Sequence, residues 1–176
     1  MVALPFAFVK ILIVIEKKVA GVTGRDLERF AEQARRAARV SGEVNILITG
    51  DPELRRLNRA FRHMNKSTDV LSFPATSSGV AGDIAISADI AAQNARAFGH
   101  SLTDELKTLI LHGLLHLAGH DHERDNGQMA RKETQLRDRL GLPAGLIERA
   151  SYVEGSARQK PAHSRRRPAA PRRTPA

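Results

Sequence analysis

The chain has 176 residues, of which 41% are hydrophobic and only 4% aromatic, enough for one domain with an aliphatic core. It has no cysteine, which excludes disulfides and thiolate metal sites and leaves histidine and carboxylate side chains as possible metal ligands. The formal net charge is +9, but residues 155–176 hold seven of the 28 Lys and Arg residues and none of the 19 acidic ones. We therefore expect a cytoplasmic protein with a nearly neutral folded domain at 1–154 and a disordered basic tail at 155–176.

The order of apolar segments and turn residues predicts alternating strands and helices. Residues 1–15 are strongly apolar but fall short of the roughly 20 that cross a bilayer, so we expect one or two buried strands and no membrane anchor. Further strands are expected at 44–49, 69–73 and 82–87, a loop at 75–81, and helices starting near 23, 51, 87, 103 and 125. This pattern predicts an α/β (α+β) fold, with a mixed sheet of about four strands packed with about five helices.

The second helix has a well-defined start signal. Asp51 is expected to cap it, with Pro52 at its first position. Leu57 and Phe61 are expected to face the core, while the arginines of the same helix point elsewhere.

The segment 109–122, LILHGLLHLAGHDH, carries the residues with catalytic chemistry. His112 and His116 are four residues apart, so their imidazoles lie on one face of a helix. Gly119 can end that helix in the left-handed conformation, and His122 follows three residues later. Three imidazoles would hold one Zn²⁺ per chain and leave a fourth position for water, as in catalytic zinc sites. The domain is therefore expected to be zinc-hydrolase-like.

One residue between these histidines argues against a peptidase. The spacing matches the metzincin signature H-E-x-x-H-x-x-G-x-x-H, in which the Glu is the general base of peptide hydrolysis. Here Gly113 occupies the Glu position, so the ligand spacing is kept without the base. A substrate other than a peptide is indicated.

HGLLHLAGHDH, together with LNRAFRHMNKSTDVLSFP at 57–74 and GDIAIS at 82–87, resembles the YbeY family of bacterial metal-dependent endoribonucleases. The resemblance implies a zinc-dependent, single-strand-specific endoribonuclease that hydrolyses RNA phosphodiesters in rRNA 3′-end maturation and ribosome quality control. It also implies partners: an rRNA precursor, the small ribosomal subunit with one of its proteins, and a ribosome-associated GTPase.

Several residues besides the histidines are candidates for the site. Arg62 takes the position of the family's essential arginine, and its planar guanidinium suits the oxygens of a phosphoryl transition state. Arg62 and Arg59 are the expected RNA-binding residues. Asp121 is the candidate catalytic carboxylate, although the residues leave the general base open. The remaining candidates would orient the ligands or shape the cleft: Glu105, Asp83, Asp69, Thr68 and Ser72.

Two other functions compete with the nuclease. One is a metal-dependent peptidase. The other is a non-catalytic RNA-binding protein whose metal only pins the end of the helix. The basic tail is either a solvated extension or an arm for phosphate backbones.

Overall fold

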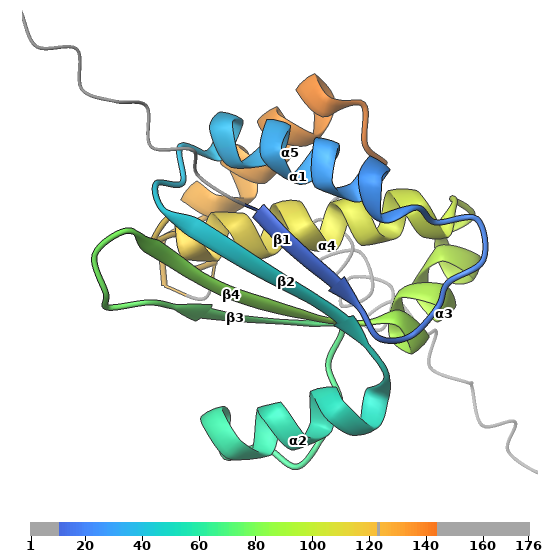
Figure 1. Cartoon of the computed structure of the whole chain (residues 1–176). Helices are drawn as coiled ribbons and strands as arrows, with labels where there is room; N and C mark the ends of the chain where they lie inside the picture. Colours follow the sequence, from blue (N-terminus) through green and yellow to red (C-terminus); the bar gives the residue numbers. More distant parts are fainter. Residues whose placement is uncertain (1–10, 123, 144–176) are drawn as a thin grey trace, which may run out of the picture.

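The computed structural model describes residues 11–122 and 124–143 and confirms the expected α/β fold (Figure 1). Within these ranges there are four strands and five helices. The strands are β1 (Ile11–Ile15), β2 (Glu43–Thr49), β3 (Val70–Pro74) and β4 (Val80–Ser87). The helices are α1 (Gly24–Ala38), α2 (Asp51–Arg62), α3 (Ala88–Phe98), α4 (Leu102–Leu117) and α5 (Gln128–Leu140). The domain boundary after 154, the tail at 155–176 and any strand before Ile11 lie outside the described residues.

The sheet is mixed, with the strand order β1-β2-β4-β3. β1, β2 and β4 are parallel, and β3 runs antiparallel to β4. The parallel strands require crossover connections, which α1 provides between β1 and β2, and α2 with β3 provides between β2 and β4. In this order β3 lies at one edge of the sheet, and it packs against α4.

The helices cover the two faces of the sheet unequally. Of the described helices, Figure 1 shows α1, α4 and α5 on one face and α2 alone on the other. The larger core lies under α1 and α4, where Ile46, Ile84 and Leu109 are at most 1% exposed. The smaller core lies under α2, around Leu54 and Leu71. The described residues leave part of the second face open.

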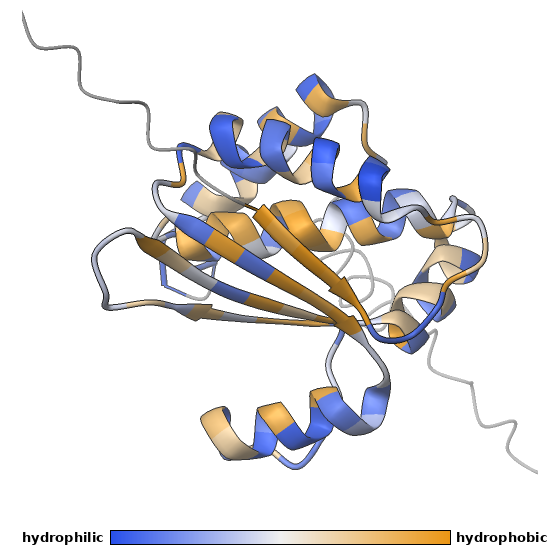
Figure 2. Ribbon diagram, in the orientation of Figure 1, coloured by the Kyte–Doolittle hydropathy of each residue, from blue (hydrophilic) through white to orange (hydrophobic). Residues whose placement is uncertain are grey.

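Strand alternation determines which side chains line each face. Ile46 and Ile84 point to the larger core, so their neighbours along the strands point to the open face. Figure 2 shows the edge strand β1 as apolar. On this strand Leu12 and Val14 are each 45% exposed. No helix among the described residues is long and apolar enough to cross a membrane.

The structure corrects two expectations for α2. The cap is Gly50 rather than Asp51, and the N–H of Asp51 donates instead to Oδ2 of Asp89 on α3, 3.0 Å away. The expectation that Phe61 faces the core is wrong, because its side chain is 64% exposed. The core beneath α2 is small, and the last turn of the helix extends past it.

Candidate metal centre

The helix α4 is built to present two histidines from inside the domain. Ser101 caps its N-terminus by accepting a hydrogen bond from the N–H of Asp104 at 3.0 Å. Most of the buried side chains of α4 are leucine or isoleucine, and His112 is buried together with them. Its neighbour one turn later, His116, is half-buried.

A glycine turn brings the third imidazole back towards the first two. Gly119 has φ +88°, and its N–H donates to the carbonyl of His116 at 3.0 Å. The N–H of His120 donates to the carbonyl of Leu115 at 3.1 Å, which closes the helix end. His122 then lies beside the other two rings, as the spacing predicts.

The three imidazoles converge on one point. Their ligand nitrogens all lie within 4.8 Å of one another, and Nε2 of His112 and Nε2 of His116 are 3.1 Å apart. Two nitrogens bound at about 2.0–2.1 Å to a tetrahedral zinc ion would be separated by about 3.3 Å, so the His112–His116 pair is close to that spacing. His122 is exposed, so one side of the cluster faces solvent.

The outward ring nitrogens of two histidines have oxygen partners. Nδ1 of His112 lies 2.9 Å from Oε1 of Glu133 on α5, and Nδ1 of His116 lies 3.0 Å from the carbonyl oxygen of His120. With Nδ1 donating, each ring leaves Nε2 free to coordinate a metal. Glu133 was missed by our sequence analysis. The sequence feature that could have indicated Glu133 is its position on the apolar face of α5, an unusual place for an acidic residue, together with Met129 and Leu136.

The environment keeps His116 neutral. Burial, together with charge repulsion from His112 and His122, lowers the pKa of His116 to about 4. At neutral pH the imidazole therefore has a free lone pair, the form that binds metals.

The cluster lies in a hollow lined by much of the expected site. This hollow, of about 250 Å³, is lined by the three histidines and by Arg62, Thr68, Asp69 and Ser72, as well as by the unpredicted Asn58, Met64 and Lys66. Asp121 lines an adjoining hollow together with Arg62, His116 and His122. The fold thus brings the end of α2, the start of β3 and the turn after α4 together around the three histidines.

Contacts within this group show what several members do. The Ser72 hydroxyl donates to the carbonyl of Gly113 at 3.4 Å and ties β3 to α4. Oδ1 of Asp69 accepts from the N–H of Val70 at 2.9 Å, so this carboxylate fixes the start of β3. The amide of Asn58 donates to the carbonyl of Lys66 at 2.7 Å and holds the turn before that strand.

Three expected residues lie elsewhere. Glu105 is two turns before His112 and is bonded to Nε2 of His100 at 2.7 Å and to the amide of Asn94 at 3.1 Å. Asp83 is on the open face of the sheet, outside both hollows that the histidines line. Arg59 is exposed on α2 and lines neither hollow.

Gly113 packs where no side chain fits. A Cβ atom at this position would lie 2.9 Å from Cδ1 and Cγ2 of Ile84 on the sheet. The position faces β4, so a glutamate there would collide with the sheet. The geometry agrees with the absence of a peptidase base.

Fold and site together define a small α/β protein with an open three-histidine cluster, the arrangement of hydrolytic metal sites. Residues 12–141 match the family model described as Endoribonuclease YbeY. A protein of that name from Koribacter versatilis (strain Ellin345) is 58% identical over 80% of this chain and 92% of its own length. Another from Solibacter usitatus (strain Ellin6076) is 53% identical over 70% and 83%. The chain belongs to the YbeY endoribonuclease family, which confirms the resemblance and the expected enzyme class.

A solved structure supports the fold independently. The solution structure of a protein from Thermotoga maritima superposes with a TM-score of 0.55 and 25% sequence identity. The match covers 90% of this chain and 100% of the other.

Proposed function

We propose that this protein is a zinc-dependent endoribonuclease that hydrolyses single-stranded RNA. The observation that carries the proposal is the convergence of His112, His116 and His122 in the same hollow as Arg62. Membership of the endoribonuclease family names the class of reaction. The site supplies the groups that such a reaction needs.

The donor set suits zinc, with one ion per chain. All three candidate ligands are imidazoles, and the chain has no thiolate to offer. When bound at such a site, zinc lowers the pKa of a coordinated water to about 7 and polarises a phosphoryl oxygen as a Lewis acid.

Other residues of the chain bind the phosphate, stabilise its negative charge and accept a proton. The Arg62 guanidinium pairs with the non-bridging oxygens and opposes the negative charge that grows on them in the transition state. Lys66 adds a second cation to the lining of the same hollow. Asp121, beside His116 and His122, is the candidate to accept a proton. Arg59 holds the RNA backbone farther along α2.

The recessed site favours an unpaired strand. The hollow of about 250 Å³ lies between α2, β3 and the turn after α4, so the scissile phosphate must enter it. The strand can bend inwards only where its bases are not stacked in a helix.

The cellular role rests on family membership. We propose that the substrate is an rRNA precursor, cut during 3′-end maturation and ribosome quality control in the cytoplasm. The proposed partners are the small ribosomal subunit, one of its proteins and a ribosome-associated GTPase.

Metal analysis combined with cleavage tests the proposal. The purified chain should bind about one zinc ion and cut an rRNA 3′ fragment, His116→Ala should lose both properties, and Arg62→Glu should keep the metal but lose cleavage. Arg96→Glu, at an exposed position on α3, is the matched control and should retain both. A metal-free preparation that cuts RNA as fast as the zinc-loaded one would overturn the proposal. Metal-dependent cleavage of peptides would point instead to the peptidase.

A further inference from the structure

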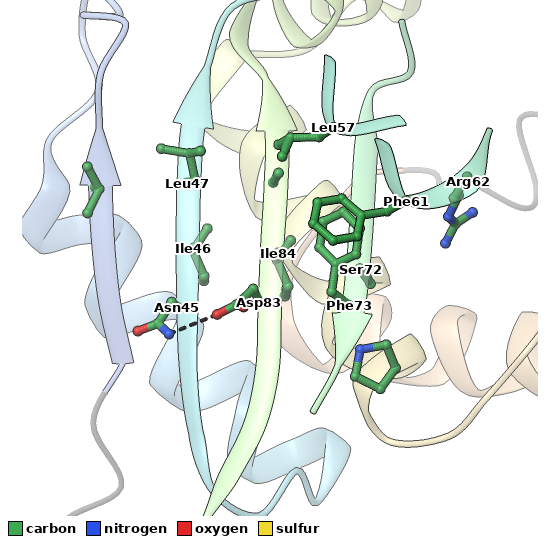
Figure 3. A pocket seen from close by; sticks show the side chains of 13 residues that line it. Asn45, Ile46, Leu47, Leu57, Phe61, Arg62, Ser72, Phe73, Asp83 and Ile84 are labelled. Carbon is green, nitrogen blue, oxygen red and sulfur yellow. Dashed lines mark hydrogen bonds between the residues drawn. The ribbon is translucent and has the colours of Figure 1, made fainter. Parts of the chain in front are cut away.

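A groove runs across the open face of the sheet, beside the metal centre. Four side chains form a row across it, each from a different element: Asn45 of β2, Asp83 of β4, Phe73 of β3 and Phe61 of α2 (Figure 3). Asp83 is paired in register with both Asn45 and Phe73, and the two phenylalanine rings are 5.0 Å apart between centroids. The groove has a volume of about 760 Å³.

The groove combines an aromatic wall with one polar pair. Phe61 is 64% exposed, although a large apolar side chain is usually buried. Opposite it, the amide of Asn45 donates to Oδ1 of Asp83 at 2.8 Å. This bond holds the carboxylate in place and occupies one of its roughly four acceptor positions, so both oxygens can still accept a hydrogen bond. A flat ring could therefore stack on Phe61 and present its edge to Asp83.

The groove continues into the metal centre. Arg62 and Ser72 line both the groove and the hollow of the three histidines. Figure 3 shows the Arg62 side chain directed away from Asp83, beyond Phe61. Consecutive residues at the end of α2 thus serve the two sites, with Phe61 at the groove and Arg62 at the metal centre.

One ligand satisfies both sites. Its anionic part must lie by Arg62, because the Asp83 carboxylate repels a phosphate. Its other part must be flat, largely apolar and able to donate hydrogen bonds to a carboxylate. A nucleotide has this distribution of charge, with the phosphate on one side and the base on the other.

We propose that the groove is the subsite for an unpaired nucleobase next to the scissile phosphate, with Asp83 selecting guanine. The inference rests on the proposed nuclease function. Guanine presents its N1–H and its 2-amino group side by side and can donate two parallel hydrogen bonds to a carboxylate. Adenine and cytosine place an acceptor nitrogen beside their amino group, and uracil offers a single N–H between two carbonyls. Both arrangements suit a carboxylate less well.

Cleavage of defined oligonucleotides by the zinc-loaded full chain tests the specificity. The substrates are oligouridylates with a single guanosine, inosine or adenosine. The cut should follow the guanosine when it is moved, with a preference over adenosine of about ten-fold or more, as expected for a paired hydrogen-bond contact. Inosine, which lacks the 2-amino group, should fall between the two. Asp83→Asn should remove the preference, whereas Asp138→Asn, at an exposed position on α5, should keep it.

The stacking partner has its own variant. Phe61→Ala should raise KM about ten-fold or more, since stacking of one base contributes that much to binding. Phe98→Ala removes another exposed phenylalanine, on α3, and should leave KM unchanged. Because Phe61 is largely exposed, its loss should leave the thermal unfolding temperature nearly unchanged.

A binding measurement separates this inference from the nuclease proposal. An oligouridylate carrying one 2-aminopurine is titrated with the full-length His116→Ala chain. Stacking should quench the fluorescence, and a Phe61→Ala substitution in the same background should abolish the quenching. If the wild type does not cleave RNA, the nuclease proposal fails. The titration would still show whether a base stacks in the groove. If the nuclease cuts all sequences equally and Phe61→Ala changes neither KM nor quenching, the base subsite is overturned. Loss of binding to a ribosomal protein in that variant would then identify the groove as a protein-docking face.

Discussion

Oε1 of Glu133 lies 2.9 Å from Nδ1 of His112, with both side chains at most 4% exposed. The carboxylate on α5 therefore determines which nitrogen of the first candidate ligand is free for a metal. It also ties α5 to α4 at the metal centre. The packing of α5 therefore affects how the His112 ring is oriented towards a metal.

Replacement of Glu133 should weaken metal binding without removing a ligand. We expect Glu133→Ala to lower zinc affinity about 10- to 100-fold, because His112 loses the acceptor that orients its ring. Glu133→Gln keeps an oxygen acceptor and should lose less. Competition with a chromophoric chelator measures both affinities. Glu28→Gln, at an exposed position on α1, is the control, and equal affinities for Glu133→Ala and wild type would contradict the assigned role.

Arg62 should act on the reaction and not on the metal. Arg62→Lys keeps the charge but loses the planar pair of donors, so we expect kcat to fall about 10²- to 10³-fold. Zinc content should remain that of the wild type, because Arg62 lines the hollow without belonging to the histidine cluster. Single-turnover cleavage together with metal analysis measures both quantities. Arg96→Lys should leave both unchanged, and loss of zinc from Arg62→Lys would show that the residue has a structural role instead.

Local patterns in the sequence predicted the three-histidine cluster. His112, His116 and His122 lie within eleven residues, and helical spacing followed by a glycine turn determines their geometry. Glu133 could not be placed in the same way, because it lies 21 residues from His112 and its contact depends on how α5 packs.

The errors in α2 have a similar origin. Apolar periodicity assigns Phe61 to the core face, but it cannot reveal that the core ends before the last turn. Residue preference selects Asp51 as the cap. The Asp51 carboxylate instead accepts a hydrogen bond from Ser87, and Asp89 accepts the Asp51 N–H. These partners are 36 and 38 residues away and are brought together only by the fold.

The close packing at Gly113 predicts a loss of stability with any side chain there. Gly113→Ala places a methyl group against Ile84 and should reduce the free energy of unfolding by about 1–3 kcal/mol, a typical cost of overpacking. Urea denaturation measures the change. Ile84→Ala in the same chain should remove the clash, so the two substitutions together should be less destabilising than their sum.

Gly113→Glu should not confer peptidase activity, and metal-dependent peptide cleavage by this variant would contradict the packing argument.

The hydrogen bond from the Asp51 N–H at the start of α2 to the Asp89 carboxylate predicts a pH dependence of stability. The side-chain bond to Lys17 and the N–H of Asp51 hold the pKa of Asp89 below its ordinary value of 3.8. The ionised carboxylate therefore stabilises the fold at neutral pH, and this contribution is lost as the pH falls below about 4 towards the lower folded pKa. Asp89→Asn keeps an oxygen acceptor for the Asp51 N–H but loses the negative charge at the start of α2 and the ion pair with Lys17, so it should reduce the free energy of unfolding by about 0.5–1 kcal/mol at pH 7. The difference from wild type should shrink by pH 3, since the Asp89 carboxyl is then largely protonated in the unfolded chain and folding must work against that protonation. Urea titrations at both pH values test this, with Asp138→Asn, at an exposed position on α5, as the control. A difference that stays constant between pH 7 and pH 3 would show that the charge of Asp89 does not stabilise the start of α2.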